Sequence, residues 1–269
     1  MKYKEIEIYC KEHNVDKKSC SYLINNSLNV PNIIKINNST ISKETEKKLK
    51  RAIERLKKEP IQYIIGNVNF YGYIYKVTKN TLIPRFETEQ LVDETIKHIK
   101  TTFKKPINVL DIGCGTGCIG ITLKKELPHI NVTLTDISKK ALKIARENSK
   151  GLDIEILHGD MLKPIKNRKY DVIISNPPYI SHDEEIMEIV KSNEPKKALY
   201  AKNNGLYYYE EILKNVSNII NKEFIIAFEI GSTQKDKIID IAKKNLKNIK
   251  IITKKDLSER DRMIFIFND

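Results

Sequence analysis

The chain has 269 residues, of which 40% are hydrophobic and 31% charged, and its formal net charge is +13. These proportions are typical of a globular protein with a substantial core, built as one large domain or as a core domain with a smaller partner. The apolar runs are far too short to span a bilayer, and residues 1–13 mix both signs of charge, unlike a signal or transit peptide. We therefore expect no membrane association and a cytoplasmic location.

The positive charge has two interpretations. It would suit an acidic partner such as RNA, DNA or a ribonucleoprotein. The lysines are spread along the whole chain, however, without a block of five or six, which favours a general bias towards Lys, Asn and Ile. The four cysteines form no pair of CxxC units, so we expect neither a zinc site nor a disulfide framework, and no other metal.

Residues 1–60 are predicted to form a small helical domain. Apolar residues recur there at spacings of three and four positions over residues 6–13, 18–28 and 42–59. Ser42 and Thr45 offer hydroxyl groups for an N-cap, and Pro60 would stop the last helix. Residues 67–84, rich in aromatic and β-branched residues, then predict a β-hairpin that joins two parts of the chain.

After a helix expected at residues 85–100, strands and helices alternate. Strands are expected at residues 107–113, 131–136, 154–160, 170–176, 223–231, 249–253 and 262–268, and helices at 118–127, 138–150, 204–220 and 232–246. The near-continuous apolar strands indicate a parallel sheet covered on both faces. Residues 254–261 are too few for a crossover helix, so the last two strands should pair antiparallel. A mostly parallel seven-stranded, Rossmann-like sheet with a terminal antiparallel hairpin is the pattern of class I methyltransferases.

The segment VLDIGCGTGCIG places Gly113, Gly115 and Gly117 between a strand and a helix. Absent side chains let the backbone turn tightly and approach a ligand at the helix N-terminus. Gly115, Gly117 and Gly120 alone satisfy the G-x-G-x-x-G pattern of nicotinamide and flavin sites, which is a weak signal. An acid on the strand before G-x-G-x-G is instead typical of sites for S-adenosylmethionine. Asp111 supplies that acid, and it suits a methionine end that carries an ammonium and a sulfonium and no phosphate.

Two further acids follow the next two strands. Asp136 ends the second strand, where either class of cofactor has a ribose-binding carboxylate. Asp160 ends the third strand, where methyltransferases have acids near the adenine. Asp136 could instead cap the helix that begins at Ser138. With Asp111, however, three acids fall on the carboxyl edge of the sheet, and this favours a cofactor site.

Asn176, Pro177, Pro178 and Tyr179 form a stiff corner after the fourth strand. The prolines fix φ and hold Asn176 extended, so that its side chain is aimed. The Asn176 amide oxygen and the Pro177 carbonyl are acceptors, which beside the Tyr179 ring suit a planar NH2 group of an amide or a base. If these acceptors took hydrogen bonds from both N–H groups, the nitrogen would be favoured to attack a methyl group without help from a strong base. A plain turn is the alternative, but the neighbouring glycine-rich turn favours catalysis.

Over nearly its whole length, and most strongly from Pro60 onward, the chain resembles the HemK/PrmC family of protein-(glutamine-N5) methyltransferases. The matching segments are IPRFETE (residues 83–89), DIGCGTGCIGITL (111–123), YDVIISNPPYI (170–180), NEPKKALYAKNNGLYYYEEI (193–212) and FEIGSTQ (228–234). The resemblance implies a helical domain for substrate recognition (1–60), a β-hairpin linker (61–84) and a methyltransferase domain (85–269). It further implies S-adenosylmethionine as cofactor and, as substrate, the Gly-Gly-Gln glutamine of class I peptide chain release factors, with no direct nucleic-acid substrate. A monomer is the default expectation.

The resemblance also implies roles for residues that match the family's motifs. The cofactor would be held by Asp111, Gly113, Gly115, Gly117, Asp136, Asp160 and Asn176, with Asp136 on the ribose and Asp160 near the adenine. Catalysis would rest on Asn176, Pro177 and Tyr179. The substrate would contact Asn176, Pro177, Pro178, Tyr179, Arg85 and Glu87, with Glu89 on the same linker side. Two residues depart from the family pattern: Phe86 stands where a proline is usual, which could reshape the linker, and Glu259 where a glycine is expected.

Two other functions compete. An adenine-N6 DNA or RNA methyltransferase would use a similar corner on an exocyclic amine, but it needs a domain that reads sequence and stabilises a flipped base. Residues 1–60 are few and lack a concentrated basic face. A catalytically inactive cofactor binder or a dehydrogenase-like protein is the second rival, but no Cys, His and Lys constellation for hydride transfer is apparent.

Overall fold

The computed structural model describes residues 3–28 and 40–269, which form two compact units. The first unit contains the described residues up to Asn67 together with Ile186–Asn193, and the second contains Val68–Glu185 and Glu194–Asp269. Residues 1–2 and 29–39, which belong to the expected helical domain, lie outside the described part. The division into three functional parts stays a prediction.

The first unit is helical. Its helices are α1 (Tyr3–Glu12), α2 (Lys17–Leu28), α3 (Lys43–Leu56), α4 (Ile61–Ile65) and α8 (Glu188–Asn193). Ser42 caps α3, because its Oγ accepts the Thr45 N–H at 3.1 Å, whereas Thr45 lies inside the helix. Pro60 is not next to the end of α3; it occupies the N-cap position of α4. Apolar faces of α1, α2 and α3 enclose a core that includes Ile24 and Ile53.

The hairpin of β1 (Asn67–Phe70) and β2 (Tyr73–Lys76) is shorter than the expected 67–84. Tyr71 and Gly72 connect its strands with φ values of 52° and 78°, the pair of positive angles that a tight two-residue hairpin turn uses. Tyr75 is buried, and its hydroxyl hydrogen-bonds Thr122 Oγ1 at 2.7 Å. This bond joins the hairpin to the body of the second unit.

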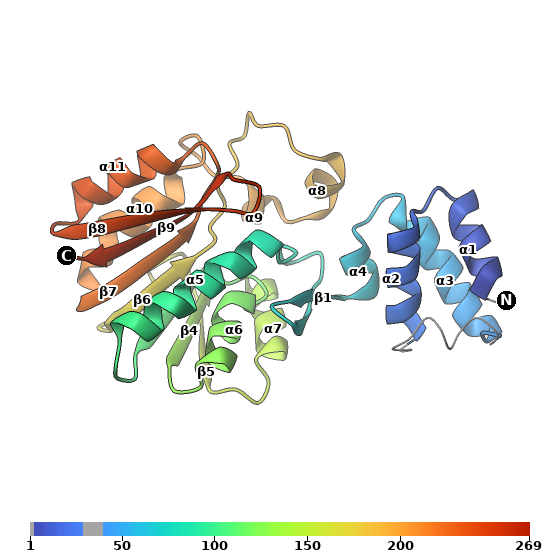
Figure 1. Cartoon of the computed structure of the whole chain (residues 1–269), viewed down its shortest axis with the longest axis horizontal. Coiled ribbons are helices and arrows are strands. Elements are labelled where there is room, and N and C mark those ends of the chain that lie inside the picture. Colours follow the sequence, from blue (N-terminus) through green and yellow to red (C-terminus); the bar gives the residue numbers. More distant parts are fainter. Residues whose placement is uncertain (1–2, 29–39) are drawn as a thin grey trace. The chain divides into compact units, whose positions relative to one another are not determined.

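A seven-stranded sheet forms the centre of the second unit (Figure 1). Its strands are β3 (Asn108–Ile112), β4 (Asn131–Asp136), β5 (Ile154–His158), β6 (Tyr170–Ser175), β7 (Ile220–Glu229), β8 (Ile249–Lys255) and β9 (Asp261–Asn268). Their order is β5-β4-β3-β6-β7-β9-β8. Strands β3 to β7 are parallel, and β9 is antiparallel to both β7 and β8. The expected sheet and its antiparallel hairpin are confirmed.

Helices cover both faces of this sheet (Figure 1). One face carries α5 (Phe86–Thr102), α6 (Cys118–Glu126) and α7 (Lys139–Asn148), and the other carries α10 (Tyr207–Asn215) and α11 (Lys235–Asn245). Because side chains alternate along a strand, Leu110 and Ile112 pack in the core beneath α10 and α11, whereas Asp111 contacts Gly120 of α6. The short helices α4, α8 and α9 (Lys196–Leu199) are not anticipated, since four to six residues show no helical periodicity.

Phe86 begins α5 and is 58% exposed. Arg85 before it is extended, with φ −107° and ψ 154°. A residue that precedes proline prefers this conformation, so the backbone here follows a course that the family's usual proline would also allow. The departure at Phe86 therefore changes the surface rather than the path of the chain.

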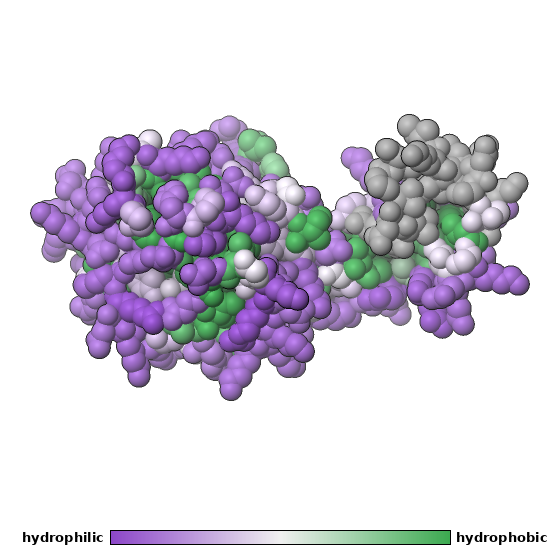
Figure 2. Space-filling view, turned by 90° about the horizontal axis from the view of Figure 1, so that it is seen from below, coloured by the Kyte–Doolittle hydropathy of each residue, from purple (hydrophilic) through white to green (hydrophobic). Residues whose placement is uncertain are grey.

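Polar side chains cover most of the visible face of the second unit in Figure 2, with an apolar area near its middle. Across residues 3–28 and 40–269, no helix has both the length and the apolarity that a membrane span requires.

Candidate active site

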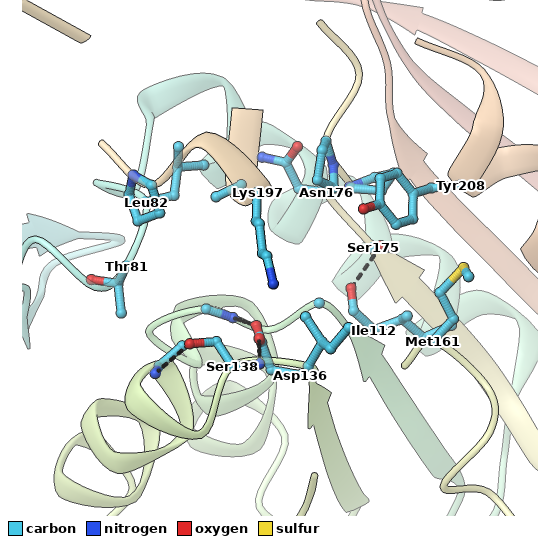
Figure 3. A pocket seen from close by; sticks show the side chains of 18 of the residues that line it. Thr81, Leu82, Ile112, Asp136, Ser138, Met161, Ser175, Asn176, Lys197 and Tyr208 are labelled. Atoms are coloured by element: carbon cyan, nitrogen blue, oxygen red, sulfur yellow. Dashed lines mark hydrogen bonds between the residues drawn. The ribbon is translucent and has the colours of Figure 1, made fainter. Parts of the chain in front are cut away.

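A cavity of about 280 Å³ opens at the carboxyl ends of the parallel strands (Figure 3). Seven of the expected site residues line it: Gly113, Gly115, Asp136, Asp160, Asn176, Pro177 and Pro178. The structure therefore brings together the glycine-rich turn, two of the acids and the stiff corner, which come from four different strand ends. The other expected residues lie outside the cavity wall: Asp111, Gly117, Tyr179, Arg85, Glu87 and Glu89.

The glycine-rich turn has few backbone donors left for a ligand. Gly113 and Cys114 both donate their N–H groups to the Thr135 carbonyl, at 2.8 and 2.9 Å, and Gly115 donates to Asp136 Oδ2 at 2.9 Å. A pyrophosphate needs free amides at this place, whereas here the amides are occupied and a carboxylate faces the cavity. The nicotinamide and flavin interpretation is therefore disfavoured.

Gly113 and Gly115 both have positive φ, and a Cβ added to either would meet no atom within 4 Å. The turn therefore leaves open space beside the backbone, where a ligand can approach. Gly120, the third glycine of the competing pattern, has another purpose: a Cβ there would lie 2.3 Å from Leu134 Cδ2. Its absent side chain lets α6 pack on β4.

Asp136 ends β4 and lines the cavity. Its Oδ1 accepts the Ser138 N–H at 2.7 Å, while its Oδ2 holds Gly115. The N-cap of α7 is Ser138, whose Oγ accepts the Ala141 N–H, so the alternative of Asp136 as the cap is wrong. Burial raises the pKa of the Asp136 carboxyl.

Asp111 lies behind the turn and is fully buried. Its Oδ2 accepts the Gly120 N–H at 3.0 Å, and its Oδ1 has no partner among the residues that the structure describes. Burial raises the pKa of this carboxyl to about 7. An unpaired, buried carboxylate oxygen costs free energy unless a donor reaches it, and a water molecule that bridges it to a cofactor ammonium could provide such a donor.

Part of the cavity wall is apolar. Ile137 is 51% exposed, and Met161, Ile212 and Tyr208 join it in the wall. Asp160 also lines the cavity, and its Oδ2 pairs with Lys163 Nζ at 2.6 Å. A flat heterocycle such as adenine would cover the exposed Ile137 side chain. The residues thus fit S-adenosylmethionine: the Asp136 carboxylate and several apolar side chains line the cavity, and the amides of the glycine-rich turn that would cradle a phosphate are occupied.

Asn176 is tied to two residues that the sequence did not single out. Its Nδ2 donates to Thr88 Oγ1 at 3.1 Å, and the Thr88 hydroxyl donates to Glu229 Oε2 at 2.6 Å. The Asn176 amide nitrogen is therefore engaged, and its oxygen is left as an acceptor. Both residues lie within segments of the resemblance, FETE and FEIG, but only the fold shows that they meet.

Tyr179 packs against the core beside α10 and α11, and its own carbonyl accepts Gln234 Nε2 at 2.9 Å. A Cβ on Gly231 would lie 3.4 Å from the Tyr179 ring. Burial raises the pKa of the Tyr179 hydroxyl. The ring is thus held in place from behind, which fixes the end of the stiff corner.

Arg85 pairs with Glu194, whose side chain is only 1% exposed. Glu194 Oε2 also accepts the Ile83 N–H at 3.1 Å. The Glu194 carboxylate thereby ties the segment after the hairpin to the segment before α9. Leu82 on one side and Pro195 on the other line the cavity, so this pair shapes its wall. Roles of Arg85 and Glu87 in binding substrate stay predictions.

Known proteins share this fold. Residues 88–206 match the family model "Methyltransferase small domain". A methyltransferase from Pyrococcus furiosus aligns with a TM-score of 0.54 and 16% identity, over 81% of this chain and 96% of that one. The ribosomal protein L11 methylase of Lactobacillus delbrueckii subsp. bulgaricus aligns with a TM-score of 0.51 and 20% identity, over 69% and 81% of the two chains. The protein is a class I, S-adenosylmethionine-dependent methyltransferase.

Relatives with higher identity identify the family. The release factor glutamine methyltransferase of Enterococcus faecalis is 39% identical over 225 residues, which cover 82% of this chain and 80% of the relative. The release factor glutamine methyltransferase of Bacillus subtilis is 35% identical over 226 residues, which cover 81% and 78%. The chain belongs to the release factor glutamine methyltransferase family.

Proposed function

We propose that this enzyme methylates the side-chain nitrogen N5 of the glutamine in the Gly-Gly-Gln motif of class I peptide chain release factors. The observation that carries the proposal is the orientation of Asn176. Its nitrogen is engaged by Thr88, so its oxygen is the group left to accept a hydrogen bond from a substrate at the cavity. The names of the relatives support a glutamine of a release factor as that substrate.

The cofactor would lie between the glycine-rich turn and the stiff corner. Asp136 would accept hydrogen bonds from the ribose, Asp160 and Ile137 would lie at the adenine end, and Asp111 would favour the positively charged methionine end. When bound, S-adenosylmethionine supplies an electrophilic methyl group on a sulfonium. Open space beside Gly113 and Gly115 supports this placement.

Asn176 Oδ1 and the Pro177 carbonyl would accept hydrogen bonds from the two N–H groups of the glutamine amide. Hydrogen bonds to these acceptors reduce the delocalisation of the nitrogen lone pair into the glutamine carbonyl group. The nitrogen therefore becomes a better nucleophile. Because Pro177 and Pro178 have no N–H, the corner offers acceptors without a competing donor. The amide proton needs no strong base, since it becomes acidic only when the nitrogen forms its new bond, and water can take it.

An adenine-N6 methyltransferase shares the demand for acceptors around an NH2 group, but no curated relative reported above bears that name. We also propose that the enzyme is a monomer, that it acts in the cytoplasm and that no nucleic acid is its direct substrate. Recognition of the release factor would involve the first unit.

Labelled S-adenosylmethionine tests the proposal. The protein would be incubated in parallel with a release factor, with the Gly-Gly-Ala variant of that factor, and with DNA and RNA. We expect label on the wild-type factor alone. Label on nucleic acid, or equal label on the Gly-Gly-Ala variant, would refute the substrate assignment.

A further inference from the structure

We propose that Thr88 and Glu229 are positioning residues, which hold the Asn176 amide with its oxygen towards the substrate nitrogen. The inference rests on the proposed function, because it assigns Asn176 as the acceptor for the glutamine amide. Neither residue lines the cavity, so any effect on methyl transfer must act through Asn176.

The direction of the hydrogen bonds decides the orientation. A carboxylate only accepts, so Thr88 must give its single hydroxyl proton to Glu229 at 2.6 Å. Thr88 Oγ1 can then only accept from Asn176, at 3.1 Å, and Asn176 must offer its NH2 group there. The amide oxygen consequently points away from Thr88. A reversed amide would place two acceptors against each other.

Burial makes this arrangement stiff. Thr88 and Glu229 are each 2% exposed, so water is a poor substitute for either partner. The Tyr209 hydroxyl donates to the Glu229 carbonyl at 2.7 Å, which fixes the end of β7. Three elements therefore meet at the Asn176 amide. Thr88 comes from α5, Glu229 is the last residue of β7, and Asn176 itself directly follows the last residue of β6.

The charge state of Glu229 determines the direction of these hydrogen bonds. Burial raises the pKa of the Glu229 carboxyl to about 7. The charged and titratable groups that face the Glu229 carboxyl are Arg262 on β9, Glu87 on α5, Tyr179 in the corner, Tyr209 on α10 and the Cys118 thiol on α6. A protonated Glu229 could donate to Thr88, and Thr88 could then donate to Asn176. That reversed chain would draw the Asn176 oxygen towards Thr88 and away from the substrate.

Substitutions at Thr88 separate positioning from packing. Thr88→Val removes the hydroxyl at nearly constant shape, and we expect kcat to fall on the order of 10–100-fold, with the Kd for S-adenosylmethionine within about twofold of wild type. Thr88→Ser restores the hydroxyl and should recover most of kcat. Thr95→Val is the matched control in the same helix, because Thr95 is buried and its hydroxyl donates to the Leu91 carbonyl; its kcat should match wild type.

The pH profile gives an independent readout. Wild-type kcat should rise through about pH 7 as Glu229 loses its proton. Glu229→Gln should remove this rise, because the neutral amide keeps an acceptor for Thr88 at every pH. The inference is overturned if Thr88→Val keeps wild-type kcat, if Thr88→Ser is as slow as Thr88→Val, or if the rise persists in Glu229→Gln. A wild-type enzyme that leaves the release factor unlabelled would instead overturn the proposed function, and the inference with it.

Discussion

The Asp136 carboxylate accepts the backbone N–H of Gly115 at 2.9 Å. This bond joins the end of β4 to the turn that follows β3, two places that are 21 residues apart in the chain. The acid proposed to bind the ribose thus also fixes the glycine-rich turn. If Asp136 binds the ribose as proposed, cofactor binding and the conformation of the turn are coupled through this one side chain.

Asn176→Ala should lower kcat on the order of 10²–10³-fold, the effect seen when one preorganised hydrogen-bond group is lost from a transition state. The Kd for S-adenosylmethionine should change little, because the turn and Asp136 are untouched. Single-turnover kinetics and titration calorimetry check the two quantities. Asn215→Ala, on the exposed end of α10, is the control. If cofactor affinity fell as much as kcat, the corner would belong to the cofactor site alone.

Asp111→Asn should stabilise the ligand-free protein at high pH. The pKa of Asp111 is about 7 in the folded protein, against an ordinary value of 3.8. Between these pH values the unfolded chain loses a proton that the folded protein keeps, so the stability that Asp111 contributes falls as pH rises from about 4 to about 7. The variant lacks this loss, and its unfolding free energy at pH 8 should exceed that of wild type by on the order of 1–4 kcal/mol.

Urea unfolding at pH 5 and pH 8 measures the effect of Asp111→Asn. The same variant should bind S-adenosylmethionine more weakly, since it lacks the charge that favours the methionine ammonium. A variant that gains no stability at pH 8 relative to pH 5 would show that Asp111 is ionised without penalty in the folded protein.

Arg85→Met should destabilise the protein by about 1–3 kcal/mol, because it leaves the buried Glu194 carboxylate without its cation. In the Glu194→Gln background the same substitution should cost less, since the neutral amide can still accept the Ile83 N–H. A double-mutant cycle in urea gives the coupling. Equal losses in both backgrounds would mean that Arg85 acts through its packing alone.

Glu259→Gly should raise the unfolding free energy by about 1 kcal/mol, because Glu259 has a φ of 60°, which disfavours every residue with a side chain. Its ion pair with Lys255, at 3.6 Å and largely exposed, contributes little. Glu259→Ala removes the ion pair but keeps the backbone strain, so thermal unfolding of the two variants separates these causes. Equal stability of the glycine and alanine variants would contradict the prediction.

The sequence determined the architecture of the methyltransferase unit. Continuous apolar strands in alternation with amphipathic helices require a sheet covered on both faces, and a link of residues 254–261 is too short for anything but an antiparallel pair. The glycine-rich turn and the stiff corner were also readable, because glycine and proline act on the backbone locally. Short helices such as α9 were not predicted, because so few residues cannot show the hydrophobic periodicity of a helix.

Only the tertiary structure decided how the site is assembled. Thr88 and Asn176 are 88 residues apart, and Thr88 and Glu229 are 141 apart; strand order and helix packing bring them together, and no local pattern encodes a hydrogen bond over that distance. The fold likewise placed Asp111 behind the turn and Asp136 within the cavity, although both acids belong to neighbouring strands. Burial and the direction of each hydrogen bond, which decide what a polar side chain can do, are set by contacts between distant segments.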